Sequence, residues 1–205
     1  MRCAIFAKKN QMKHCLFVLL TICCISGVAF SQEKIPAIDK SPLDISYFPV
    51  NFPLMKVQEK TSENLIARII YSRPSMNGRK VFGELIAFEK LWRLGANEAT
   101  EIEFFTDVYI NKTKVKKGRY SIYAIPTPTK WTIIINKALD TWGAFNYNAS
   151  KDVIRVAVDV EYISQPVESF SAIFDSINPK TVGLQFFWEN AKVILPITLT
   201  KPLSS

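Results

Sequence analysis

Apolar and polar side chains alternate along most of the chain from residue 65 to residue 199. The clearest example is the segment 154–160, where four β-branched residues are separated by Arg155, Ala157 and Asp159. Such a period of two places the branched side chains on one face of an extended strand and does not match the 3.6-residue period of a helix. The pattern therefore predicts a fold built from half-buried β-strands.

Eight or nine segments of this kind follow one another, with turn residues between them and no long helical pattern. Two packed antiparallel sheets bury the apolar faces of such strands. We therefore expect an all-β antiparallel β-sandwich of about eight or nine strands, with one or two short helical turns near residues 83–92 and 138–142. The expected strands centre on residues 65–71, 102–108, 120–124, 131–136, 154–160, 170–174, 182–188 and 193–199, with Pro196 at an edge or a bulge.

The N-terminal segment has the three parts of a secretion signal. Lys8, Lys9 and Lys13 make its start basic, residues 15–25 are apolar, and a small-x-small site ends at Ser31. The apolar run is shorter than the roughly 20 residues of a membrane span. We expect residues 1–31 to be a cleaved signal peptide and the mature protein to be exported to the periplasm or the extracellular space.

Two details of this leader stay open. Translation from Met12 would produce a more compact signal of the same kind, so the start lies at Met1 or at Met12. Whether the mature protein stays in the periplasm, is secreted, or attaches to the outer membrane does not follow from the sequence.

Export changes the chemistry that is available to the mature chain. All four cysteines and the one histidine, His14, precede residue 25. Without them, a Ser-His-Asp or Cys-His nucleophile, a His or Cys metal site and a disulfide framework are excluded. We expect no cofactor and no metal site, and a role in binding is favoured over catalysis.

Removal of the leader also halves the net charge. The leader carries four basic residues and no acid, so the charge falls from +8 to +4, which does not indicate a nucleic-acid partner. The densest basic run that remains, Lys112–Arg119, is expected at a hairpin tip. No later segment has the pattern of a transmembrane helix. We expect residues 32–64 to form a proline-rich extended lead-in packed on the domain, and residues 65–205 to form the β-sandwich.

Several motifs in the mature chain are more specific than strand and turn patterns. They are KSPLDISYFPVNFP from residue 40, YSRPSMNGRKVFGELIAFEKLWRLGANEAT from residue 71, GRYSIYAIP from residue 118 and DTWGAFNY from residue 140. With these motifs, residues 39–199 closely resemble a family of exported bacterial proteins common in Bacteroidetes, the domain of unknown function family 2911. The resemblance implies export and a compact, mostly β domain, and it implies no activity.

The motifs gather polar and aromatic side chains on expected loops and strand ends. Pro74 favours an extended backbone at Arg73, and the turn signal Asn77-Gly78 directly precedes Arg79. Guanidinium groups bind carboxylates and phosphates in a bidentate manner, and tryptophan rings stack on sugars. The candidate ligand-binding residues are Arg73, Arg79, Trp92, Arg93, Asn97, Glu98, Thr100 and Trp142.

Three hypotheses account for this cluster. In the first, the exported protein is not an enzyme and binds a small anionic or sugar-like ligand, a glycan or an envelope partner. In the second, Glu98 is the acid or base of a hydrolase or isomerase that acts on envelope or polysaccharide material, with an arginine orienting the substrate. In the third, one of the arginines pairs with Glu98 to fix the loops, and Trp92, Trp142 and Phe145 belong to the core.

Overall fold

The computed structural model describes residues 35–61 and 64–203. The predicted signal peptide, residues 1–31, lies outside the described residues. Residues 39–205 form a unit separate from residues 1–38, and every element described below belongs to it.

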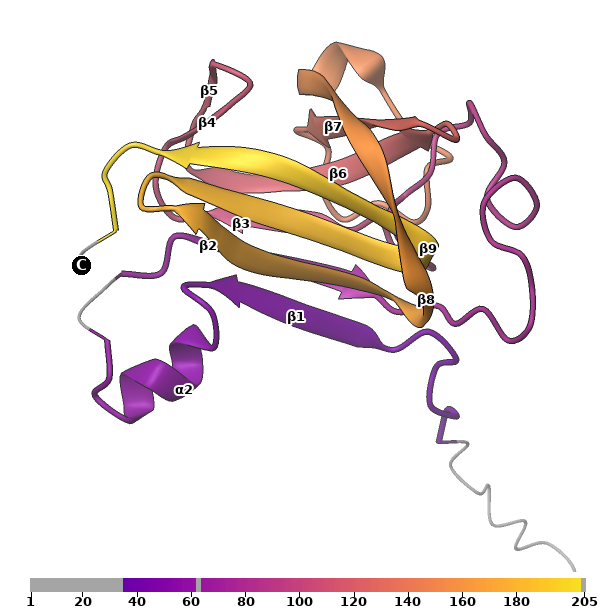
Figure 1. Ribbon diagram of the computed structural model, residues 1–205, viewed down its shortest axis with the longest axis horizontal. Helices are drawn as coiled ribbons and strands as arrows, with labels where there is room; N and C mark the ends of the chain where they lie inside the picture. Colours follow the sequence, from indigo (N-terminus) through magenta and orange to yellow (C-terminus); the bar gives the residue numbers. More distant parts are fainter. Residues whose placement is uncertain (1–34, 62–63, 204–205) are drawn as a thin grey trace, which may run out of the picture. The chain divides into compact units, whose positions relative to one another are not determined.

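Antiparallel β-strands make up most of this unit (Figure 1), so the prediction of an all-β fold is confirmed. The described residues form nine strands, one helix and one 3-10 turn. The strands are β1 (Leu43–Phe48), β2 (Ala67–Ser72), β3 (Glu101–Phe104), β4 (Val108–Ile110), β5 (Thr113–Val115), β6 (Gly118–Pro126), β7 (Lys130–Asn136), β8 (Asp152–Asn178) and β9 (Thr181–Leu199); the helix is α2 (Phe52–Val57), and the 3-10 turn is η1 (Ala149–Lys151).

The strands are hydrogen-bonded in the order β1-β2-β3-β6-β7-β8-β9-β4-β5. The long strand β8 connects two layers, because its first part pairs with β7 up to Asp159 and its second part pairs with β9 from Val160 onward. Figure 1 shows the sharp bend of β8 between these two parts. The sheet thus folds over its own apolar face and forms a sandwich.

Two pairs of expected strands are each one continuous, bent strand. The segments expected at 154–160 and 170–174 both lie in β8, whose pairing register shifts between Tyr162 and Ser171. The segments expected at 182–188 and 193–199 both lie in β9, which folds back at Glu189, where φ is 52° (Figure 1). The turn signals in these regions therefore produce bends and bulges within a strand.

The core between the layers is built around tryptophan rings. Trp92 stacks on Trp188 with ring centroids 5.8 Å apart, and it meets Trp131 edge-on at 5.6 Å. Phe82 and Phe170 pack against the same cluster. Each such aromatic pair contributes about 1 kcal/mol beyond the burial of apolar area. Trp92 lies on the long loop between β2 and β3, so the core fixes this loop as firmly as it fixes the strands.

The lead-in has more regular structure than its four prolines suggested. β1 pairs with β2 along its whole length, from Leu43 opposite Ser72 to Phe48 opposite Ala67. α2 follows, with a proline in its first turn. Proline lacks a backbone N–H, and this costs no hydrogen bond there, because the first N–H groups of a helix have no acceptor within the helix. No helix within the described ranges is long and apolar enough to cross a membrane.

The helical turns expected at residues 83–92 and 138–142 do not form. Positive φ angles at Gly83, Glu89 and Asp140 break the helical path in these segments. The helical turns that do occur in the described residues are α2, which precedes the strands that the alternation predicted, and η1, which lies between β7 and β8.

The loop between β2 and β3 is fixed at both ends. Met76 N donates to Glu168 O at 2.8 Å, and Phe170 N donates to Pro74 O at 2.9 Å, so the start of the loop pairs with β8. Near its other end, Trp92 exchanges two backbone hydrogen bonds with Ala124 of β6, at 2.8 and 2.9 Å. The loop therefore closes one side of the sandwich between the two layers.

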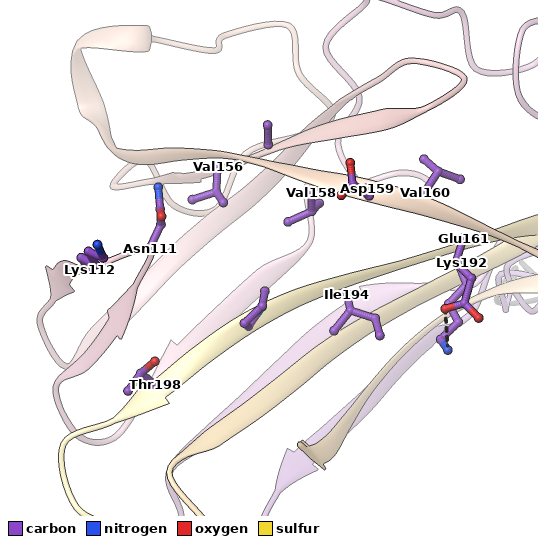
Figure 2. Close-up of a pocket in the computed structure, with 12 residues that line it drawn as sticks. Asn111, Lys112, Val156, Val158, Asp159, Val160, Glu161, Lys192, Ile194 and Thr198 are labelled. Atoms are coloured by element: carbon purple, nitrogen blue, oxygen red, sulfur yellow. Dashed lines mark ion pairs between the residues drawn. The ribbon is translucent and has the colours of Figure 1, made fainter. Parts of the chain in front are cut away.

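A groove of about 650 Å³ opens between β8 and β9 (Figure 2). It lies next to Val160 and Val193, the pair at which the two strands separate. The hairpin formed by β4 and β5 borders the groove with its tip, Asn111 and Lys112. Of the basic run expected at a hairpin tip, only Lys112 lies there, and the residues after it run through β5 into the start of β6. The groove exists because β8 leaves β9 at Val160 to pair with β7.

We expect the substitution Gly95→Ala to be more destabilising than Gly78→Ala. Gly95 has a φ of +152°, and an added Cβ would lie 3.1 Å from Ser72 O, whereas Gly78 has a φ of +73° and open space around it. The substitution should lower the free energy of unfolding by about 3 kcal/mol at Gly95 and by about 1 kcal/mol at Gly78. Denaturant unfolding of the two variants measures both values, and equal losses would contradict this account of the loop.

Candidate functional site

Arg73 and Arg79 bind groups of the protein itself. Arg73 Nη1 lies 2.9 Å from Asp44 Oδ2, and Arg73 Nη2 donates to Ser171 Oγ at 3.0 Å. Arg79 donates to two carbonyl oxygens of its own turn, those of Ser75 and Met76. Arg73 therefore connects β1 with β8, and Arg79 stabilises the turn that precedes it.

Trp92 and Thr100 are buried, and their predicted contact with a ligand stays a prediction. Trp92 is 4% exposed, and its Nε1 donates to Gly95 O at 3.1 Å. The Thr100 hydroxyl donates to Leu94 O. Trp92 lines the small cleft that also contains Arg93, but so little of its ring is exposed that it offers no open face for a stacked sugar. Both side chains instead hold the backbone of residues 92–100 in place.

Asn97, Glu98 and Trp142 lie together on two short segments that pair outside the main sheet. Glu98 and Trp142 form an isolated antiparallel bridge, and Gly143 N donates to Asn97 O at 2.9 Å. Trp142 is 61% exposed and Phe145 is 84% exposed, so the expectation that these two rings belong to the core is wrong.

The predicted pairing of an arginine with Glu98 is also wrong for the described part of the chain. Arg73 pairs with Asp44, and Glu98 forms no ion pair with any described residue. Glu98 instead borders a small cleft of about 190 Å³ together with Glu101 and Asp140. Within the described ranges, no three Asp, Glu, His or Cys side chains come close enough to hold a metal ion.

Arg93 is the predicted site residue with the most unusual surroundings. Its side chain is partly buried, and its Nε has neither solvent contact nor a hydrogen-bond partner among the described residues. Burial lowers the pKa of the Arg93 guanidinium below its usual value, because water stabilises the charged form less well there. The charge is thus partly desolvated without compensation from a carboxylate.

The other five arginines of the described residues all have partners. Arg68 also has a buried Nε without a partner, but among the described arginines only Arg93 has neither a hydrogen bond nor an ion pair from any atom of its side chain. The partners are Glu103 for Arg68, Asp44 for Arg73, two carbonyl groups for Arg79, Glu101 and Asp140 for Arg119, and Asp152 for Arg155.

Arg93 borders a cleft of about 190 Å³ on the outer side of the loop. A second cation, Lys90, lies at the same cleft and forms no ion pair with any described residue. Apolar residues also line the cleft, among them Leu85, Ile86, Leu91, Trp92 and Ala144. The cleft, which we call the Arg93 cleft, therefore combines positive charge with short hydrophobic walls.

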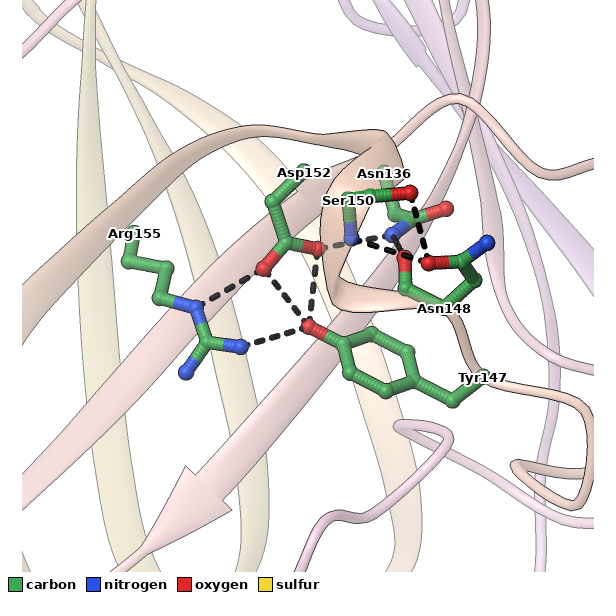
Figure 3. A network of polar contacts seen from close by, with 6 residues as sticks. All are labelled: Asn136, Tyr147, Asn148, Ser150, Asp152 and Arg155. Carbon is green, nitrogen blue, oxygen red and sulfur yellow. Dashed lines mark hydrogen bonds and ion pairs between the residues drawn. The ribbon is translucent and has the colours of Figure 1, made fainter.

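The wall formed by Ala144 is held by a polar network that the sequence did not reveal (Figure 3). Tyr147 Oη lies 2.7 Å from both carboxylate oxygens of Asp152, and Arg155 Nη2 donates to Tyr147 Oη at 2.8 Å. Asn136 Nδ2 donates to Asp152 Oδ1 at 2.7 Å. Tyr147 N donates to Ala144 O, so the network positions the loop that forms this side of the Arg93 cleft.

Only one member of this network stood out in the sequence. Tyr147 ends the DTWGAFNY motif, whereas Asn136 and Arg155 lie on strands whose alternation indicated ordinary β-structure. The pairing of β7 with β8, Asn136 opposite Asp152, is what brings them together. The pairing register is a tertiary property that no local spacing indicates.

Burial raises the pKa of Tyr147 to about 12, and its hydrogen bond to the Asp152 carboxylate adds to the rise. In the unfolded chain a tyrosine titrates near pH 10. The folded state therefore favours the neutral phenol. The stability that the folded state gains from the neutral Tyr147 phenol is fully present below about pH 10. It is lost as the pH rises through about 12.

We expect Tyr147→Phe to remove this part of the pH dependence. Between about pH 10 and pH 12, the unfolding free energy of the wild type should fall more steeply than that of the variant, because only the wild type must ionise a protected phenol. Urea unfolding of both proteins at several pH values measures the two slopes. Parallel slopes would show that Tyr147 does not titrate as the geometry indicates.

Comparison with known protein families found one match. A family model described as "Protein of unknown function (DUF2911)" matches residues 53–197, more than half of the chain, which confirms the resemblance seen in the motifs. A search of curated proteins found no match, and neither did a search of solved structures. The chain belongs to the DUF2911 family, whose members are proteins of unknown function.

Proposed function

We propose that this protein is not an enzyme and binds a small organic carboxylate in the Arg93 cleft. The observation that supports the proposal is the partly buried Arg93 guanidinium, which has no partner among the described residues. The proposal narrows the first hypothesis drawn from the sequence, in which loop arginines bind an anionic or sugar-like ligand.

The electrostatic argument starts from the cost of desolvation. A charged group that is taken out of water without a partner destabilises the fold by several kcal/mol in the extreme case of full burial, and Arg93 is partly buried. A bound anion would supply hydrogen-bond acceptors to the Nη groups of Arg93, which have no partner among the described residues and, unlike Nε, are not fully buried. The planar guanidinium forms two parallel hydrogen bonds with a carboxylate, which makes this class of ligand a good geometric match.

The size and the walls of the cleft restrict the ligand further. Its volume of about 190 Å³ is below the roughly 300–1,000 Å³ of pockets that enclose drug-sized ligands. An oligosaccharide would not fit inside it. Leu85, Leu91 and Ala144 offer contact to a short apolar group, so a carboxylate with a small hydrocarbon part suits the cleft better than inorganic phosphate does.

The two alternatives from the sequence have less support. A hydrolase that uses Glu98 needs an arginine beside that carboxylate, and Glu98 borders a different cleft from Arg93. A purely structural role needs Arg93 to pair with a carboxylate of the fold, and none of the described residues provides one. The ligand-binding proposal accounts for the unpaired charge, and the alternatives do not.

We expect Arg93→Met to abolish carboxylate binding while the protein stays folded. The substitution keeps an apolar chain of similar length and removes a charge that lacks a partner, so the unfolding free energy should stay within about 0.5 kcal/mol of the wild type or rise. A loss of about 3–5 kcal/mol would support the structural alternative, since that is the cost of leaving a buried partner charge unpaired.

Thermal and urea unfolding with butyrate or benzoate measure the binding. At ten times its Kd, a ligand should stabilise the wild type by about 1.4 kcal/mol and Arg93→Met by nothing. Butyramide and sodium chloride at equal ionic strength control for the apolar group and for salt. Arg79→Met is the matched variant and should respond as the wild type does, because Arg79 hydrogen-bonds only to its own turn. Stabilisation by phosphate alone, or by none of these compounds, would contradict the proposed ligand class.

We also propose that the protein acts outside the cytoplasm, as the basic start and the apolar run of residues 1–31 indicate. Expression of the full chain in a bacterium, followed by N-terminal sequencing of the protein in the periplasm and the medium, tests this. A mature protein that begins at Gln32 is the expected result. A chain that keeps residues 12–31 would contradict cleavage after Ser31.

A further inference from the structure

The groove between β8 and β9 contains an unused strand edge. Val160 N donates to Thr129 O at 2.9 Å, on the side of β7. In an antiparallel ladder the backbone groups of successive residues point to opposite edges. The amide groups of Asp159, Ala157 and Arg155 therefore point away from β7. On that side, pairing with β9 begins at Val160, so Asp159 lies at the end of this ladder, and Ala157 and Arg155 beyond it have no strand partner among the described residues.

The side chains around this edge leave room for another segment of chain. Figure 2 shows Val156 and Val158 on β8 facing the groove, with Ile194 on β9 across from them. Ala157 and Asp159 also border the groove. An exposed strand edge beside apolar side chains is the arrangement to which extended peptides add as a further strand.

The charges at the groove are balanced at one end and unbalanced at the other. Lys192 Nζ lies 2.9 Å from Glu161 Oε2, which neutralises both groups at the first end. Asp159 pairs with Lys130. At the second end, Lys112 on the β4–β5 turn borders the groove and forms no ion pair with any described residue. An acidic side chain of the occupant would complement this lysine.

We propose that the groove binds an extended peptide segment that pairs with the free edge of β8 at residues 155–159. The segment alternates apolar side chains, which pack on Val156, Val158 and Ile194, with polar ones, and it places an acidic residue near Lys112. This site shares no residue with the Arg93 cleft, so the two proposals succeed or fail independently.

The test uses the mature protein and a peptide of about six residues, the common length of a strand. The peptide alternates valine with threonine and ends in glutamate. We expect saturable binding with a Kd below about 1 mM, and slower hydrogen exchange at the amides of Ala157 and Asp159. No binding up to that concentration, or binding without protection of these two amides, would overturn the proposal.

Two isomers of the peptide, N-methylated at alternate residues, test whether backbone pairing carries the binding. Each isomer lacks the N–H donors of one edge, so at least one isomer should lose about tenfold or more in affinity. Equal affinity of the unmethylated peptide and both isomers would show that no strand forms, and it would overturn the proposal.

A matched pair of variants tests the location. Ile194→Asn should weaken binding about tenfold, because Ile194 borders the groove. Ile173→Asn changes an exposed isoleucine of β8 that does not border the groove, and it should bind as the wild type does. Equal effects of the two variants would place the peptide elsewhere. Replacing the glutamate of the peptide by glutamine should weaken binding to the wild type and leave binding to Lys112→Gln unchanged.

Discussion

The packing of Trp92 into the core organises the rest of the structure. A loop residue fills the space between Trp131 and Trp188, and its backbone exchanges two hydrogen bonds with β6. The loop between β2 and β3 therefore behaves as part of the sandwich. Because Arg93 follows Trp92 directly, the burial of the indole ring also holds the next guanidinium against the edge of the core, where it loses part of its hydration.

The two long strands have a double effect on the surface. β8 covers the core by crossing from one layer to the other, and β9 completes the second layer by folding back at Glu189. The crossing separates the first part of β8 from β9 and exposes a strand edge in the groove. One geometric feature thus closes the hydrophobic core and opens the groove beside this strand edge.

The polar residues divide into those that hold the fold and those that remain available. Tyr147, Asp152 and Arg155 satisfy one another, and Arg73 is satisfied by Asp44 and Ser171. Arg93 and Lys112 have no such partners among the described residues and lie at different openings. Because the other described arginines all have partners, the unpaired Arg93 is informative: an uncompensated charge destabilises the fold unless a ligand supplies the partner.

The sequence by itself determined the strand pattern, the antiparallel all-β class and membership of the family, because strand periodicity, turn residues and motifs are local features of the chain. It also indicated Arg93 as a site residue, although among eight candidates of equal standing. Only the tertiary structure decided that Trp92 is buried while Trp142 is exposed, and that Arg73 pairs with Asp44 rather than with Glu98. Asp44 comes from the lead-in, which reaches Arg73 only because β1 pairs with β2. Partners of this kind depend on the register between distant strands, and one-dimensional spacing carries no information about that register.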